Sequence, residues 1–140
     1  MISGRIMRKT STMKRLSLAL FLLGTMPAAA ADISRVMREN ICDSMPDISA
    51  KIMKRRQQGA SQDALTNSLS SAEVKSDLVY PHIYKKLVLE AVDDAYRYDV
   101  KENAADLEKQ VYNFAVEQLM LCPSRFDLHY TVLVSLGYTE

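Results

Sequence analysis

Hydrophobic residues along most of this chain recur at intervals of three and four, which is the spacing of one face of an α-helix. The clearest run predicts a helix over residues 81–98, opened by Pro81, because proline is tolerated in a first turn where its missing N–H would have no partner. A second run predicts a helix over residues 103–122, with Asn103 as its N-cap and Pro123 as its end.

The same spacing appears earlier in the chain, with one interruption. Residues 32–44 form an apolar face, and Pro46 then either starts a second helix or kinks a single long one. Gly59 is the expected end of this region, because glycine adopts a positive φ without a Cβ clash. A short helix is expected over residues 62–70, capped by Ser61.

The last part of the chain, residues 123–140, shows a different period. Its apolar residues alternate with mostly polar ones, which is typical of an extended strand. A lone strand leaves its backbone groups unpaired, so this tail is expected to pair with a second copy, lie along a groove or fold back on itself. The alternating residues are Phe126, Leu128, Tyr130, Val132, Val134, Leu136 and Tyr138.

Residues 1–31 have the three parts of a secretory signal peptide: a basic start, a short apolar run and small residues at the end. The apolar run, residues 16–26, is much shorter than the ~20 residues that span a bilayer, so no stable membrane anchor is expected after signal removal. Cleavage is predicted after Ala30 or Ala31, and Met13 is an alternative translation start. The segment predicts a periplasmic or secreted protein.

Removal of the signal changes the charge balance. The chain has 18 Lys and Arg residues and 17 Asp and Glu residues. Residues 1–31 hold five of the basic residues and no acidic one, so the mature chain has 13 basic and 17 acidic side chains, a net charge of −4. Nucleic-acid binding requires clustered positive charge, and no nucleic-acid partner is expected.

Cys42 and Cys122 are the two cysteines of the chain, too far apart for a CxxC redox motif. In exported proteins such a pair usually forms a disulfide, which we expect here in preference to reactive thiols. The bond would join the first helix to the last and stabilise the fold by about 4 kcal/mol in the chain-entropy model. With His82 and His129 as the histidines of the mature chain, neither a metal site nor a cofactor is expected.

A basic cluster precedes Gly59. Cations in the last turn of a helix interact favourably with its negative end, and composition favours this interpretation. The alternative is a binding patch for an acidic partner or for phosphate head groups. The cluster consists of Lys51, Lys54, Arg55 and Arg56.

Three carboxylates lie together in the predicted helix over residues 81–98: Glu90, Asp93 and Asp94. Paired carboxylates can catalyse hydrolysis when their environments separate their pKa values. Here Lys86 and Arg97 stand four residues from Glu90 and Asp93, which is the spacing of ordinary surface pairs. A solvated face is therefore expected. No HExxH, GxSxG or phosphate-binding glycine loop occurs in the sequence.

The order of several short motifs resembles a loose group of small exported bacterial proteins, in which a helical domain runs between two terminal cysteines. The resemblance covers residues 42–122 and implies compartment and fold, but it carries no catalytic residue across. The matching elements are Cys42, the turn from Arg56 and Gln57 to Gly59, the pair Ala95 and Tyr96, Phe114, and Cys122.

These patterns predict an all-α fold, a small bundle of four to five helices closed by one disulfide, with an extended C-terminal tail. The expected segments are a signal peptide over 1–31, a helical domain over 32–122 and the tail over 123–140. We expect a non-enzymatic interaction or inhibitor-type protein with a protein partner in the cell envelope, and a homodimer could form through the tail. A stress-protective, chaperone-like envelope protein and a small hydrolase are the alternatives.

Overall fold

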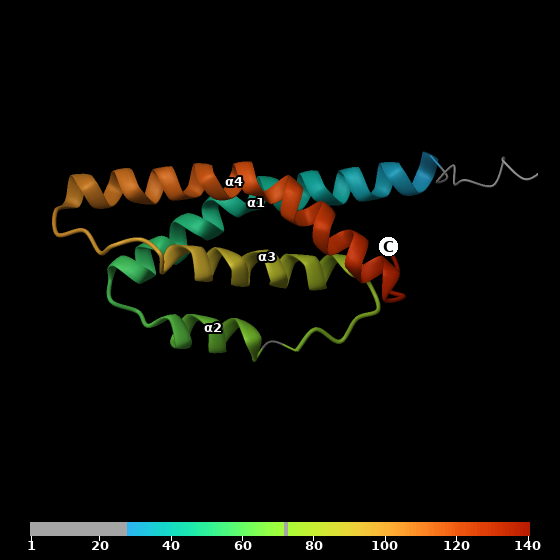
Figure 1. Cartoon of the computed structure of the whole chain (residues 1–140), viewed down its shortest axis with the longest axis horizontal. Coiled ribbons are helices and arrows are strands. Elements are labelled where there is room, and N and C mark those ends of the chain that lie inside the picture. Colours follow the sequence, from blue (N-terminus) through green and yellow to red (C-terminus); the bar gives the residue numbers. More distant parts are fainter. Residues whose placement is uncertain (1–27, 72) are drawn as a thin grey trace, which may run out of the picture.

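The structure is a computed structural model that describes residues 28–71 and 73–140, so residues 1–27 of the expected signal peptide lie outside it. The described part is all-α, as expected. Figure 1 shows α1 and α4 side by side, with α3 beneath them and α2 packed against α3. The helices are α1 (Ala28–Gln57), α2 (Gln62–Ser70), α3 (Val79–Ala95) and α4 (Ala104–Ser135).

Pro46 lies inside α1, so the two pieces expected around it are one continuous helix. Figure 1 shows that this helix changes direction along its length, which agrees with the expectation that an internal proline kinks a helix. α1 ends as the sequence predicts. Gly59 adopts a φ of +88°, and the amides of Gly59 and Ala60 donate to carbonyls of the last turn at 3.0 Å.

Two further local predictions are confirmed by the cap geometry. The Ser61 hydroxyl accepts a hydrogen bond from the backbone N–H of Ala64 at the start of α2. The Asn103 side chain accepts one from the N–H of Asp106 at the start of α4, at 2.8 Å. These caps satisfy backbone donors that have no partner within the helix.

The prediction of an extended tail from residue 123 is wrong. α4 passes through Pro123 and continues to Ser135. Only residues 136–140 lie beyond the helix, and the structure records one parallel bridge there, between Leu78 and Thr139. Residues 123–135 are therefore not an unpaired strand that would need a second copy, and the helical domain extends beyond residue 122.

Burial explains why the helix continues. Cys122, Phe126 and Leu133 are buried and fall on one side of a helix at intervals of four and seven. The alternating residues Leu128 and Val132, by contrast, remain exposed. Period two was therefore a coincidence of composition, and the side chains that reach the core follow the helical period.

The core lies between α1, α3 and α4, and the disulfide crosses it. Cys42 and Cys122 are bonded, with their Cα atoms 5.6 Å apart, which confirms the predicted pair. α1 and α4 each contain a proline close to this bond. Pro46 is four residues after Cys42, and Pro123 directly follows Cys122. The disulfide thus fixes the two longest helices near the positions where they bend.

Candidate functional site

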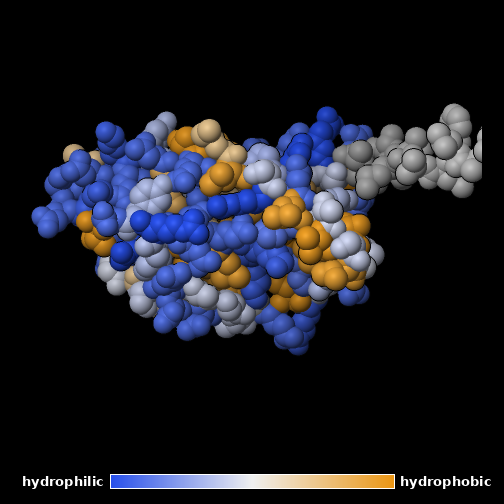
Figure 2. Space-filling model, viewed as in Figure 1, coloured by the Kyte–Doolittle hydropathy of each residue, from blue (hydrophilic) through white to orange (hydrophobic). Residues whose placement is uncertain are grey.

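The first half of α4 exposes a row of large apolar side chains, which we call the α4 apolar face. Its members are Tyr112, Val116, Leu119 and Met120, with exposed fractions of 69%, 37%, 40% and 75%. Their spacing of four, three and one places them on one side of the helix. Figure 2 shows apolar atoms at the upper edge of the molecule, over this half of α4.

The core-facing side of the same half-helix is fully occupied. Val111, Phe114 and Cys122 are buried against α1 and α3. The α4 apolar face therefore cannot turn inward without removing these residues from the core. It is an open surface of the folded protein, and contiguous apolar surface of this kind often marks an interaction site.

α1 also carries a stripe of exposed charged residues, which we call the α1 charge stripe. Asp43 and Asp47 form its acidic end, and Lys51 and Lys54 form its basic end. All four are exposed, and none makes an ion pair within the described part of the chain. The charge of this surface thus changes sign along α1.

The structure divides the predicted basic cluster into two parts. Lys51, Lys54 and Arg55 are exposed and free to meet a partner. Arg56 instead lies over the ring of Tyr96, with its guanidinium carbon 4.7 Å from the ring centroid. This cation–π contact commits Arg56 to packing α1 against the end of α3.

The three carboxylates of α3 do not form the uniformly solvated face that the sequence predicts. Asp93 is exposed, but the side chain of Asp94 is only 8% exposed. Asp94 Oδ2 accepts hydrogen bonds from Arg125 at 2.7 Å and from Gln118 at 3.0 Å. Its other oxygen lies 3.0 Å from Arg97. Asp94 falls on the inner side of α3 because it is seven residues from the buried Leu87.

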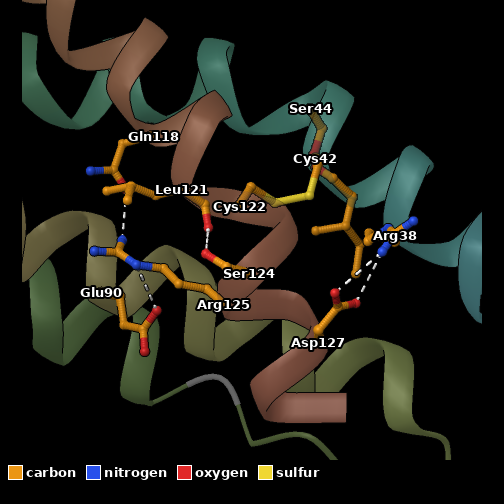
Figure 3. The surroundings of a disulfide bond; sticks show 11 residues. Arg38, Cys42, Ser44, Glu90, Gln118, Leu121, Cys122, Ser124, Arg125 and Asp127 are labelled. Carbon is orange, nitrogen blue, oxygen red and sulfur yellow. Dashed lines mark hydrogen bonds and ion pairs between the residues drawn. A yellow bond between two sulfur atoms is a disulfide. The ribbon is translucent and has the colours of Figure 1, made fainter. Parts of the chain in front are cut away.

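Arg125 links this group to Glu90. Its Nη1 donates to Gln118 Oε1 at 3.0 Å, and its Nε lies 3.6 Å from Glu90 Oε2. Figure 3 shows the Arg125 side chain reaching from α4 between Gln118 and Glu90. His129 Nε2 lies 2.8 Å from the other Glu90 oxygen. Together these residues form an ionic cluster that joins α3 to α4.

The ionic cluster consists of groups that bind one another. Both oxygens of Asp94 are engaged, and Glu90 faces Arg125 and His129. Such an arrangement holds two helices in one register. The sequence signal for it was available, since Gln118, Arg125 and His129 follow the helical spacing of Cys122. The alternating apolar residues after Pro123 hide this signal, because they predict a strand in place of a helix.

Two tyrosines at the end of α3 have shifted pKa values. The Tyr98 hydroxyl donates a hydrogen bond to Glu117 of α4, and this bond, with burial, raises the pKa of Tyr98 to about 12. The Tyr96 hydroxyl donates to the carbonyl of Ala60. Burial raises the pKa of Tyr96, partly offset by the positive charge of Arg56. Both bonds anchor the α3–α4 connection.

The described residues offer neither a metal site nor a membrane span. Within residues 28–71 and 73–140, no three His, Cys, Asp or Glu side chains come together in a way that could hold a metal ion. Among the helices formed by these residues, none is both long and apolar enough to cross a bilayer.

Comparison with known proteins leaves the function to be argued from this geometry. No protein-family model matches the chain, and neither the curated proteins nor the solved structures contain a match.

Proposed function

We propose that this chain is an exported, non-enzymatic binding protein that holds a protein partner against the α4 apolar face. The observation that carries the proposal is the exposure of four large apolar side chains on one side of a well-packed helix. Tyrosine and methionine are enriched at protein interfaces. The spacing of the four residues also matches that of the apolar side chains by which an amphipathic helix docks into a groove on a partner.

The position of the face supports a role in binding. Met120 is two residues before Cys122, whose disulfide ties α4 to α1. A surface held rigid before binding loses less conformational entropy when a partner docks. The partner would therefore meet a preformed helix, and the affinity would come from apolar burial.

Export is the second part of the proposal. It is supported by the signal-like residues 1–31, and the buried disulfide of the described part is compatible with it. We assign Glu90 and Asp94 a structural role, because ionic and hydrogen-bonded contacts within the protein engage both residues.

Site-specific photo-crosslinking in the cell that makes the protein tests the binding surface. A benzophenone amino acid replaces Val116 in one tagged version and the exposed Asp63 of α2 in a matched control. The expected result is one discrete crosslinked product from position 116 and none from position 63. Equal products from both positions, or none from position 116 in folded protein, would overturn the proposal.

A second apolar surface favours one further candidate function. Leu128, Val132 and Leu136 are exposed on the second half of α4, at intervals of four. Figure 2 shows apolar atoms gathered near the C-terminal end of the chain. A chaperone-like protein of the cell envelope would use such surfaces to hold unfolded clients.

Light scattering separates the two candidates. A chaperone-like protein suppresses aggregation of a heat-denatured client, and Leu128→Glu weakens that suppression. Absence of any effect with the protein in molar excess rules this candidate out and leaves the α4 apolar face as the binding surface.

A further inference from the structure

A hollow of about 390 Å³ lies along α4 beside the α4 apolar face. Three members of that face line it, and among the described residues of its wall Glu117 is the one that carries a charge. All of these side chains border one space, so the apolar surface and the carboxylate belong to a single site. The lining residues are Tyr112, Asn113, Val116, Glu117, Met120 and Leu121.

The carboxylate of Glu117 is held in place by α3 without being neutralised. Its Oε2 accepts a hydrogen bond from the Tyr98 hydroxyl. The Tyr98 ring in turn packs edge to face against the fully buried Phe114, with the ring centroids 5.5 Å apart. Because a phenol carries no charge at neutral pH, this bond fixes the position of the carboxylate and leaves its charge unpaired.

No cation of the described chain compensates this charge. Within residues 28–71 and 73–140, Glu117 takes part in no ion pair, and its Oε1 has no hydrogen-bond partner. The residue is half-buried, so water still reaches it in the free protein. A partner that covers the hollow displaces this water, and covering an unpaired carboxylate is unfavourable unless the partner supplies a counter-charge. The site therefore selects against a purely apolar partner.

We propose that the hollow takes a segment of another protein in which a Lys or Arg stands beside apolar side chains. The apolar side chains cover Val116 and its neighbours on the face, and the cation pairs with Glu117. The inference rests on the proposed function, because it gives the chemistry of the partner of the same surface. Apolar burial supplies the affinity, and the carboxylate supplies the selectivity. The net charge of −4 of the mature chain also favours a basic partner segment.

Photo-crosslinking from position 116, in the cell that makes the protein, tests the role of the charge. The benzophenone stays at position 116, and Glu117 is changed to Gln in one version and to Lys in another. Both versions are expected to lose most of the discrete product, because Gln leaves the cation of the partner without a counter-charge and Lys repels it. The matched control is Glu39→Lys, since Glu39 is exposed on α1 outside the hollow, and it is expected to keep the product.

A second control separates the charge from the internal hydrogen bond. Tyr98→Phe removes the bond to Glu117 but keeps the carboxylate, so it is expected to keep the product. Loss of the product in Tyr98→Phe, to the same extent as in Glu117→Gln, would show that the internal bond matters and overturn the inference. A circular dichroism spectrum identical to that of the native chain shows that each variant is folded.

The partner segment itself gives a measurement that needs no change at Glu117. Mass spectrometry of the digested product from position 116 is expected to find a Lys or Arg within four residues of the crosslinked partner residue. A synthetic peptide of that segment is then titrated with the mature protein and followed by fluorescence anisotropy. Glu117→Gln is expected to raise the Kd by roughly tenfold. A peptide with Glu in place of the cation is expected to bind Glu117→Lys more tightly than it binds the native chain.

The outcomes distinguish this inference from the proposed function. It is overturned by a partner segment without Lys or Arg in that range, by a product formed from two copies of this chain, or by an undiminished product from folded Glu117→Lys. In each of these cases position 116 still crosslinks a protein, so the proposed function stands. If position 116 crosslinks nothing in the otherwise native chain, both fail.

Discussion

Arg125 Nη2 lies 2.7 Å from Asp94 Oδ2, so a side chain from the second half of α4 neutralises a carboxylate in the last turn of α3. The contact exists because α4 continues past Pro123 and presents Arg125 on the side that faces α3. Gln118 completes the group by bonding both partners. Asp94 is the least exposed charged residue of this ionic cluster. Its carboxylate is largely shielded from bulk water and is held by polar partners instead.

Removing Arg125 is expected to destabilise the fold markedly. Arg125→Met keeps much of the side-chain volume but leaves Asp94 buried without its main counter-charge. Breaking a buried pair from one side costs about 3–5 kcal/mol, and the 24% exposure of Arg125 puts the expected loss near the lower end. The measurement is the free energy of unfolding from urea titration at neutral pH.

The matched control for this variant is Arg97→Met, which removes the other cation at Asp94. Arg97 is 75% exposed, so its loss is expected to cost no more than about 1 kcal/mol. The double variant Asp94→Leu/Arg125→Met removes both charges and is expected to recover much of the lost stability. Equal losses from the two single variants would contradict the assignment of Arg125 as the main counter-charge of Asp94.

The disulfide is expected to supply a large share of the stability. Replacing Cys42 and Cys122 together by alanine is expected to lower the free energy of unfolding by about 4 kcal/mol in the chain-entropy model. Urea titration of the oxidised native chain and of the double variant measures the difference. The control is the native chain in reductant, which should lose a similar amount. Two free thiols in the unreduced exported protein, seen by mass spectrometry after alkylation, would contradict the bond.

Much of the fold could be predicted from local signals. Gly59, Ser61 and Asn103 act on backbone groups within a few residues of themselves, so their effect does not depend on the rest of the molecule. Gly137 ends α4 in the way that Gly59 ends α1. It has a φ of +93°, and the amides of Gly137 and Tyr138 donate hydrogen bonds to carbonyls of the last turn. The alternating residues before Gly137 favour a strand, so the sequence pattern alone does not identify this glycine as a helix end.

Features that depend on packing between distant elements could not be predicted as well. Whether Pro123 ends α4 depends on whether Phe126 and Leu133 find a core beyond it, and that core is supplied by α1 and α3. The burial of Asp94 likewise depends on Arg125, 31 residues away. The exposure of the α4 apolar face could not be predicted either, because an apolar helix position does not reveal how many neighbours will cover it.

Cleavage of the signal is expected to leave α1 with a new first residue. Mass spectrometry of the exported chain is expected to find Ala31 or Asp32 at the N-terminus, after cleavage behind Ala30 or Ala31. Replacing both alanines by leucine is expected to leave the precursor uncleaved, since signal peptidase requires small side chains there. The control is Ile33→Leu, beyond the cleavage point. An exported chain that retains residues 16–26 would contradict the signal-peptide assignment.

Alkaline pH is expected to destabilise the protein through Tyr98. Its pKa is about 12 in the folded state, raised from an ordinary value of 10.0 by the hydrogen bond to Glu117 and by burial. Below pH 10 both states keep the phenolic proton and the contribution of Tyr98 is complete. Between pH 10 and pH 12 the unfolded chain loses this proton while the folded chain retains it, so stability falls as pH rises.

Tyr98→Phe is expected to make this decline shallower in urea titrations from pH 9 to pH 12. Tyr112→Phe, which removes an exposed hydroxyl of the α4 apolar face, is the matched control and should decline as steeply as the native chain. Equal slopes for all three proteins would contradict a raised pKa at Tyr98.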